Sequence, residues 1–580
     1  MTLFAGAFHL RSTHLPPELK TSLRCHLRRQ ADSLGKTHVH DLANFFLVKW
    51  DSGAFQEPAW RNAEDGSVAA LAGDPLLFTS SNRLNRKQQL DRLAPHGAAP
   101  DDTELAKCRG SFALVHHDAK NNQLYLATDA LGLRSIYYVV QDGCLIFSTA
   151  LRVLEAMLEV RKKLSLLGMA ELSVFTFPLA ERTPYKGITV LRECQSLTAN
   201  AAGVTLHNYD DWSTLQDSPE TPAQAAKQLH SIFREAVSIR LGSDRKAYSF
   251  LSGGMDSRAI VATQLDLGRQ VEALNFSSTA SQDQLYAQLF SAQTGGRCNL
   301  HCLAGGVFPN FSLLAHAAKT ELEQRQPTGV DRPAFIWSGD GGSVGLGHVY
   351  MDTQMLAHAQ RGDMQAAVHH FLEFNNLALS SKVFTRAARQ QLPQLLLDSV
   401  TREVHRYPCK DLGRQLYFFL LFNDQRRHLS KHFESIDQHG LELLTPFFDT
   451  VFLKAVASTP VHWGVLHRLY AELFTHLPEF ARKTPWQTYP EHVPCPVAGK
   501  PGASYQWAPT PIQREGLVAR SAVALALVRT VSHNLHSPFS QARVGVAALL
   551  HALGLRDCRH ILLRLQLYQQ FGIHTQTPGI

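Results

Sequence analysis

The most constraining feature of the sequence is residues 248–260, YSFLSGGMDSRAI, in which an apolar run ends in Ser252-Gly253-Gly254-Met255-Asp256-Ser257 and an apolar, helix-like segment follows. This order predicts a strand, a tight glycine turn and the N-terminus of a helix. The turn would present backbone N–H groups and the positive end of the helix dipole to an anion, and its glycines would let the backbone approach a phosphate. Because Asp256 would be repelled by a bare phosphate, its presence predicts a bridging Mg2+.

The turn resembles the PP-loop of ATP pyrophosphatases rather than a Walker loop, since no Gly-x4-Gly-Lys-Ser/Thr run occurs in the chain. Proteins with a PP-loop grip the β- and γ-phosphates of ATP while the α-phosphorus is attacked. The resemblance therefore implies adenylation of a carboxylate or a similar oxygen, with pyrophosphate as the leaving group. An ordinary glycine-rich turn between a strand and a helix is the alternative interpretation.

Composition sets the class of protein. The chain has 580 residues, enough for two or three domains, and its 44% hydrophobic and 18% charged residues are typical of a soluble globular protein. The net charge of +7 permits an acidic ligand such as ATP but does not indicate nucleic-acid binding.

The nine cysteines are scattered, which argues against a disulfide framework. The first residues lack the basic region and long apolar run of a signal peptide, and the apolar patches 521–528 and 544–555 are too short to span a bilayer, so we expect a cytoplasmic protein.

Two domains are expected, with a boundary in the polar, proline-containing stretch 216–222. Residues 1–215 contain short alternating segments broken by turn residues, which predicts an antiparallel, sandwich-like layer with a few helices. Residues 216–580 begin with an amphipathic helix over 223–241 and then alternate strand and helix, which is typical of a parallel doubly wound sheet. A later strand brings Asp340 to the end of an apolar run, and helical patterns dominate from Met355 onward. Ligand is expected outside the carboxyl ends of the strands.

With these pieces located, the chain resembles the asparagine synthetase B family over nearly its whole length. Residues 109–114 and 128–138 look like the amidotransferase-type N-terminal domain of that family, and the PP-loop, 283–287, 338–342 and 442–449 look like its synthetase domain. The resemblance implies an α/β protein in which an Ntn-amidotransferase-like α+β sandwich (1–215) precedes a synthetase domain with a helical C-terminal part (216–580). It also implies an AMP-forming carbon–nitrogen ligase that uses ATP and Mg2+.

The resemblance assigns roles to individual residues. Asp256 and Asp340 are the implied Mg2+ ligands, and Asp340 is also a catalytic candidate. Glu442 is expected to lie near the reacting centre and to help deprotonate the incoming amine, or else to be a surface carboxylate. Arg468 or Lys483 would supply positive charge to the leaving group, although Lys483 is equally compatible with a solvated loop. The implied nucleotide contacts are Leu251, Ser252, Gly253, Gly254, Asp256, Ser257, Asn275 and Gly339.

Departures from the family pattern alter the expected activity. Thr2 occupies the place of the cysteine that hydrolyses glutamine, and the glutamine-binding Asn-Gly-Glu loop is missing, because the comparable region 81–86 reads SNRLNR. The N-terminal domain is therefore predicted to be a scaffold without glutaminase activity. Ser343 stands where the family has a second Mg2+-binding aspartate, and His467 or Arg468 replaces a lysine. These losses leave a weakened or inactive synthetase as an alternative.

Without a local source of ammonia, the amine must arrive with the substrate. Within the family this describes β-lactam synthetases and lasso peptide cyclases, and the runs 82–86, 467–473 and 484–486 look more like the cyclases. The resemblance implies macrolactam formation between the N-terminal amine of a precursor peptide and an Asp or Glu side chain. It implies a leader-processing protease and a leader-binding protein as partners. Two alternatives stay open: a ligase that joins a small carboxylate to ammonia or an internal amine, and a non-catalytic scaffold that binds peptide or nucleotide.

Overall fold

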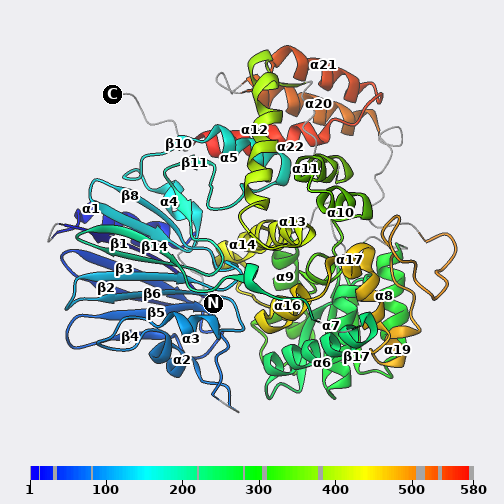
Figure 1. Cartoon of the computed structure of the whole chain (residues 1–580), viewed down its shortest axis with the longest axis horizontal. Coiled ribbons are helices and arrows are strands. Elements are labelled where there is room, and N and C mark those ends of the chain that lie inside the picture. The colour runs from blue at the N-terminus through cyan, green and yellow to red at the C-terminus, as the bar shows by residue number, and fades with distance from the viewer. Residues whose placement is uncertain are drawn as a thin grey trace.

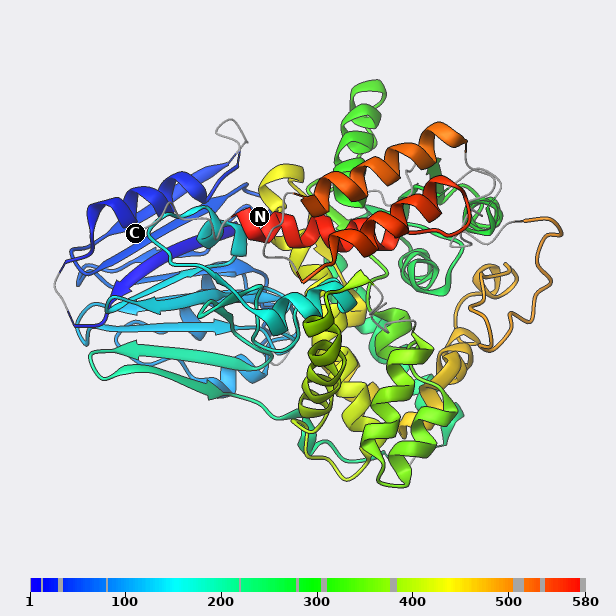
Figure 2. The same cartoon turned by 90° about the horizontal axis from the view of Figure 1, so that it is seen from above.

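The computed structural model describes residues 2–11, 14–29, 35–79, 82–218, 221–277, 281–303, 310–375, 383–503, 516–532 and 538–573, and the side chains of 425–428, 532, 572 and 573 are outside the description. A β-sandwich occupies one side of the molecule and a mixed helix–sheet domain the other, with the last helices lying beside α12 (Figures 1 and 2).

Two six-stranded sheets form the N-terminal domain, with strand orders β12-β8-β9-β1-β3-β2 and β14-β13-β7-β6-β5-β4. Every pair of neighbours within them is antiparallel. Phe4, Phe8 and Phe45 of the first sheet pack with Val115 and Leu126 of the second in one buried cluster. The predicted sandwich is therefore confirmed. The strands are β1 Thr2–His9, β2 Lys36–Asp41, β3 Phe45–Asp51, β4 Trp60–Asn62, β5 Val68–Gly73, β6 Phe112–Asp118, β7 Gln123–Thr128, β8 Tyr137–Gln141, β9 Cys144–Ser148, β12 Thr189–Val190, β13 Gln195–Asn200 and β14 Gly203–Asn208.

Short helices and a small hairpin complete this domain. Asn85 caps α2 through a reciprocal bond with Gln88, and Ser165 caps α5 by accepting from the N–H of Gly168, so polar residues in the sequence fix where both helices start. The additional elements are α1 Pro17–His26, α2 Arg86–Leu93, α3 Asp102–Ala106, α4 Leu151–Ala156, α5 Leu166–Phe175, and the hairpin of β10 Lys163–Leu164 with β11 Tyr185–Lys186.

The second domain is built on a five-stranded sheet of order β17-β16-β15-β18-β19, in which all neighbours are parallel. Thr221 and Gln224 form a capping box at the start of α6, and Pro222 occupies its first turn, so the predicted helix begins one residue earlier than expected. The parallel sheet predicted from the alternating pattern is confirmed. Its elements are α6 Pro222–Leu241, β15 Lys246–Phe250, α7 Met255–Asp266, β16 Gln270–Asn275, α8 Gln282–Ala292, β17 Cys298–Cys302, α9 Phe311–Arg325, β18 Phe335–Trp337 and β19 Glu442–Leu444.

Helices make up most of the remainder, as the pattern after Met355 predicts. The described part of the chain contains no helix that is both long enough and apolar enough to cross a membrane. The helices are α10 Thr353–Gln360, α11 Met364–Phe374, α12 Arg386–Val404, α13 Leu412–Leu420, α14 Arg426–Glu434, α15 Ile436–His439, α16 Thr450–Ala457, α17 Val461–Gly464, α18 Arg468–Phe474, α19 Glu479–Arg482, α20 Leu517–Ser532, α21 Gln541–Ala552 and α22 Arg559–Ile573.

Buried ion pairs join the two domains. Arg134 of the sandwich pairs with Glu442 of β19, and both side chains are at most 5% exposed. Arg109 donates to Asp449, whose side chain is fully buried. Arg192 places two guanidinium nitrogens 2.8 and 2.9 Å from the carboxylate of Glu403. Because a buried charge that loses its partner is costly, these pairs fix the sandwich against the second domain.

Candidate active site

The glycine turn lies between β15 and α7, at the carboxyl edge of the parallel sheet. The N–H of Leu251 still bonds the carbonyl of Leu274 on the neighbouring strand, at 3.0 Å, and the helix begins at Met255. No described side chain caps α7, whose N-cap is Gly254. The hydroxyls of Ser252 and Ser257 lie 2.9 Å apart. The turn thus leaves a helix N-terminus with two hydroxyls beside it, the arrangement that suits a phosphate.

Neighbouring elements hold the shape of this turn. The N–H of Gly253 donates to the carboxylate of Asp283 on α8 at 2.9 Å, and a Cβ at position 253 would lie 2.7 Å from the Cα of Asp283. Arg258 is fully buried and donates to the carbonyl of Gly253 in the turn at 3.2 Å and to those of Thr484 and Pro485 at 2.7 and 2.9 Å. It therefore ties the turn to a segment more than 200 residues away, a contact for which the sequence gives no local signal.

The next strand contributes the other expected nucleotide contacts. Asn275, at the end of β16, donates to the carbonyl of Leu251 at 2.8 Å, so its side chain ties the two strand ends together. Three aromatic rings gather beside it, with centroids 6.2–6.4 Å apart: Phe250, Phe276 and Phe311. This cluster was not predicted from the sequence, since its members come from three separate segments. It offers an apolar wall next to the phosphate turn.

Two acidic residues meet at the start of α7. The Oδ1 atom of Asp256 is buried, and burial is the main cause that raises the pKa of this side chain to about 6, with a smaller contribution from the charge of Asp340. Ser343 donates to Oδ2 of Asp256 through its N–H at 3.0 Å and its hydroxyl at 2.8 Å. The phenol of Tyr470 also interacts with this carboxylate and lowers its pKa against the effect of burial. Ser343 therefore holds the Asp256 side chain by hydrogen bonds, where an aspartate would have added a carboxylate to Asp256 and Asp340.

This pair of carboxylates fits Mg2+. The ion favours oxygen ligands, often takes only one or two carboxylates and completes its shell with water and phosphate oxygens. The Asp256 carboxylate, whose Oδ1 atom is buried, and the charge of Asp340 nearby match that requirement. Glycines bring the two segments together, because a Cβ at Gly339 would lie 2.6 Å from the N atom of Ser257 and one at Gly342 would lie 2.5 Å from Oδ1 of Asp256.

The structure does not bring the two predicted cationic residues onto the turn. Lys483 is exposed and pairs with Glu479 at 2.6 Å, as a solvated lysine would. Arg468 begins α18 with an exposed side chain. No described contact joins either side chain to residues 252–257. The adjoining segment does reach the turn, because the N–H of Gln487 donates to the carbonyl of Gly253 at 3.0 Å.

His467 takes a buried place near the site. Its Nδ1 lies 2.6 Å from Nδ1 of His492, its ring stacks on Tyr489, and its backbone adopts a left-handed conformation. Burial, aided by the neighbouring imidazole of His492, lowers the pKa of His467 to about 3. The pair is consequently neutral at physiological pH. The family lysine that the sequence comparison placed here is replaced by an uncharged pair.

Glu442 lies away from the turn, and its placement opposes the predicted role. It is the first residue of β19 and pairs in register with Phe335, whereas Trp337, two residues later, is level with Ser249 of β15. With about 3.3 Å per strand residue, Glu442 is well over 10 Å from the carboxyl edge where the turn lies. Its carboxylate pairs with Arg134 of the sandwich. The register between β18 and β19 places Glu442 at this level of the sheet, and that register cannot be read from the sequence.

The region around Thr2 differs from what the sequence comparison suggested. Thr2 is buried and its hydroxyl accepts from the N–H of Gly73 at 3.3 Å, so the loop that faces it begins at the end of β5. Arg83, from the run expected in that place, pairs instead with Asp74, and Arg86 is bonded to the carbonyl of Gly73. The run 82–86 thus supports the facing loop from behind. Thr2 lies in a closed, strand-paired environment opposite Asp51.

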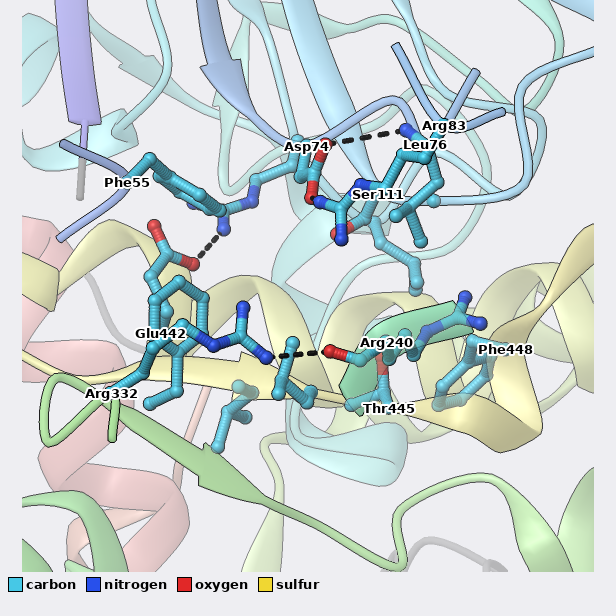
Figure 3. Close-up of a pocket in the computed structure, with 16 residues that line it drawn as sticks. Phe55, Asp74, Leu76, Arg83, Ser111, Arg240, Arg332, Glu442, Thr445 and Phe448 are labelled. Carbon is cyan, nitrogen blue, oxygen red and sulfur yellow. Dashed lines mark hydrogen bonds and ion pairs between the residues drawn. The ribbon is translucent and has the colours of Figure 1, made fainter. Parts of the chain in front are cut away.

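A cavity of about 30 Å³ lies between the domains (Figure 3). Asp74, Arg83 and Ser111 line it from the sandwich, and Arg240, Arg332 and Glu442 line it from the synthetase domain. Its arginines are paired: Arg83 with Asp74, and Arg332 with Asp244. A space of this size holds water rather than a metabolite. It separates the surroundings of Thr2 from the parallel sheet.

Comparisons with known proteins agree with this division. Residues 99–210 match a glutamine amidotransferase domain and residues 228–330 match asparagine synthase. The sequence is similar to asparagine synthetase [glutamine-hydrolyzing] 3 of Bacillus subtilis, with 30% identity over 26% of this chain and 25% of that protein. It is also similar to the putative asparagine synthetase [glutamine-hydrolyzing] 2 of Methanocaldococcus jannaschii, with 28% identity over 26% of this chain and 30% of that protein.

The chain therefore spans between a quarter and a third of the length of these curated relatives of the family. Among solved structures, the glutamine phosphoribosylpyrophosphate amidotransferase from B. subtilis, complexed with ADP and GMP, is a distant match. It has 11% identity, a TM-score of 0.24 and coverage of 59% of this chain and 82% of that one.

Proposed function

We propose that the protein is an ATP-dependent, AMP-forming carbon–nitrogen ligase. The observation that carries the proposal is the helix N-terminus at Gly254, with Ser252 and Ser257 beside it and Asp256 and Asp340 adjoining, at the carboxyl edge of a parallel sheet. Ligands of such sheets bind at that edge. The similarity to asparagine synthetases supports the same chemistry.

The reaction has two steps. A carboxylate oxygen attacks the α-phosphorus of ATP, the bond to the β-phosphate oxygen breaks, and pyrophosphate leaves. An amine then attacks the acyl carbon of the acyl-adenylate, loses its proton, and AMP departs with the electron pair of the broken C–O bond. The turn Ser252–Ser257 would bind the β- and γ-phosphates through backbone N–H groups and hydroxyls, and so stabilise the charge that develops on pyrophosphate. Asp256 and Asp340 would hold Mg2+, which neutralises phosphate charge when bound.

The source of the amine follows from the N-terminal domain. Thr2 is buried and paired within a sheet, and the site lacks a cysteine nucleophile at that position. A scaffold without glutaminase activity delivers no ammonia, so the nucleophile would come with the substrate. We therefore propose macrolactam formation in a precursor peptide, in which the N-terminal amine closes onto an Asp or Glu side chain. Binding both groups of one chain gives the rate advantage of an intramolecular reaction. A leader-processing protease and a leader-binding protein belong to this proposal as partners.

A second candidate is a ligase that joins a small carboxylate to free ammonia. The names of the similar proteins, which are asparagine synthetases, favour it. The two candidates share the adenylation step and differ in the acid that is activated and in the amine that attacks it.

Exchange of labelled pyrophosphate into ATP tests the shared step. The assay would use the peptides encoded by short reading frames beside the gene, and separately aspartate with ammonium chloride. Ser252→Ala and Asp256→Asn should each reduce exchange at least 100-fold, because each removes a group at the phosphate site. Ser213→Ala, in the segment between the domains, is the matched control and should retain full exchange. Undiminished exchange in both site variants would remove the assignment, and the substrate that supports exchange would choose between the candidates.

A further inference from the structure

The last three helices, residues 516–573, form a layer that we call the C-terminal layer. In Figure 1 the helices α20, α21 and α22 lie together at the top of the molecule, beside α12. Arg520 of α20 lies against Gly554, just after α21, where a Cβ would lie only 1.8 Å from a guanidinium nitrogen. The two helices therefore run in opposite directions.

Exposed aliphatic side chains are concentrated on this layer. The described chain has 18 exposed large hydrophobic residues, and half of them fall in these helices and the turns beside them. On α21, Val546, Leu549 and Leu553 follow helical spacing and are each 59% exposed. On α20, Val518 is 85% exposed. The nine residues are Leu517, Val518, Leu525, Val528, Val546, Leu549, Leu553, Leu555 and Leu563.

The opposite faces of the same helices are buried. Leu527 and Val531 of α20 and Val544 and Ala548 of α21 are all less than 5% exposed. Each helix thus has one apolar face that packs inside the protein and a second apolar face that meets solvent. Exposed apolar residues gathered on neighbouring helices are a common mark of an interaction site.

The charge of the C-terminal layer indicates which kind of partner would be complementary to it. Residues 516–573 contain six arginines, one aspartate and neither glutamate nor lysine. A partner that brings acidic residues around an aliphatic face would be complementary to this surface, whereas a second copy of the layer would meet its own positive charge. Arginine is enriched and lysine depleted at protein interfaces. None of the nine exposed residues is aromatic, although Trp and Tyr are the usual anchors at a bilayer surface.

We propose that the C-terminal layer is a docking surface for an acidic protein segment with an aliphatic face, typically one side of an amphipathic helix. Its aliphatic residues would lie on Val546, Leu549 and Leu553, and its carboxylates would meet the surrounding arginines. This proposal is independent of the ligase activity, since the layer and the phosphate turn belong to different parts of the chain.

Fluorescence anisotropy with two labelled 18-residue helical peptides tests the proposal on the full-length protein. Both peptides have leucines on one face, one with glutamates elsewhere and the other with lysines in the same positions. We expect saturable binding of the glutamate peptide, weaker binding of it at high salt, and at least tenfold weaker binding of the lysine peptide. The double variant Val546→Ser, Leu549→Ser should lose at least tenfold in affinity for the glutamate peptide.

Leu206→Ser supplies the matched control, because Leu206 is an exposed leucine of β14 in the sandwich and its loss should leave binding unchanged. Equal binding of the two peptides, or no saturable binding of the glutamate peptide, would overturn the proposal. So would cosedimentation with phosphatidylglycerol vesicles in the absence of peptide binding. Self-association of the wild type that the double variant abolishes would overturn it as well, by assigning the surface to a second copy.

Discussion

Asp449 offers the sharpest test of how the two domains are held together. Its carboxylate is fully buried and accepts from Arg109 of the sandwich at 3.0 Å and from Arg240 of α6 at 2.8 Å. It also caps α16 by accepting from the N–H groups of Val451 and Phe452 at 3.1 and 3.2 Å. One side chain therefore balances two buried cations and begins a helix.

The expected losses in the free energy of unfolding follow from these two roles of Asp449. Asp449→Asn keeps an oxygen for the cap but leaves the guanidinium of Arg240 with the carbonyls of Ala236 and Arg109 as partners. Breaking a buried ion pair from one side costs about 3–5 kcal/mol, and the lower end applies here because Arg109 retains Glu235. Asp449→Ala should cost about 1 kcal/mol more, since it also removes the cap.

Urea denaturation followed by tryptophan fluorescence and by circular dichroism measures the loss in free energy of unfolding. Arg240→Met combined with Asp449→Asn should cost less than the sum of the two single changes, because the double variant leaves no unpaired charge at that position. Asp437→Asn provides a comparison at a second interdomain carboxylate, which pairs with Arg152. A loss below about 1 kcal/mol for Asp449→Asn would refute the reasoning, because it would mean that the buried charges need no partner.

Two further changes give direct readouts. Gly342→Ala should reduce adenylation at least tenfold with little effect on folding, because its Cβ would lie 2.5 Å from Oδ1 of Asp256. Gly545→Ala on α21 is the control and should leave adenylation unchanged, because the space around Gly545 is open. Equal adenylation activity of the two variants would contradict the packing argument. His117, whose ring stacks on Phe45 with centroids 4.1 Å apart, has its pKa lowered to about 3, chiefly by burial. The unfolded chain takes up a proton below pH 6.5 while the folded one does so only near pH 3, so stability falls as the pH drops through that window. His117→Phe should remove about 2 kcal/mol of the stability that wild type loses between pH 8 and pH 5, and an unchanged pH dependence in denaturation curves would refute this.

Local patterns predict the parts of this fold whose causes are local. The glycine turn at Ser252–Ser257, the capped start of α6 and the alternating strands were all recognisable from neighbouring residues, because propensity, capping and spacing act over a few positions. Asp256 and Asp340 both follow strands of one parallel sheet and so come near the same edge, while their binding of Mg2+ stays a prediction.

The features that could not be predicted from the sequence depend on strand register or on contacts between residues far apart in the chain. Glu442 stands in a segment that looks like the synthetase family, yet it lies at the far end of its strand and its partner Arg134 is 308 residues away. The run 81–86 was compared with the glutamine-binding loop, but the residue that donates to the hydroxyl of Thr2 is Gly73, at the end of β5. Arg258 and the aromatic rings of Phe276 and Phe311 acquire their positions only through tertiary packing.

The most direct test of the central claim, that the carboxylate is activated by adenylation, follows the oxygen. The substrate acid, labelled with 18O in its carboxylate, is incubated with ATP and the protein, and the phosphates are examined by 31P NMR. Formation of an acyl-adenylate transfers one labelled oxygen to AMP and none to pyrophosphate, because the attacking oxygen stays on the α-phosphorus when the amide forms. Label in inorganic phosphate together with ADP would contradict the account, since it would show attack at the γ-phosphorus.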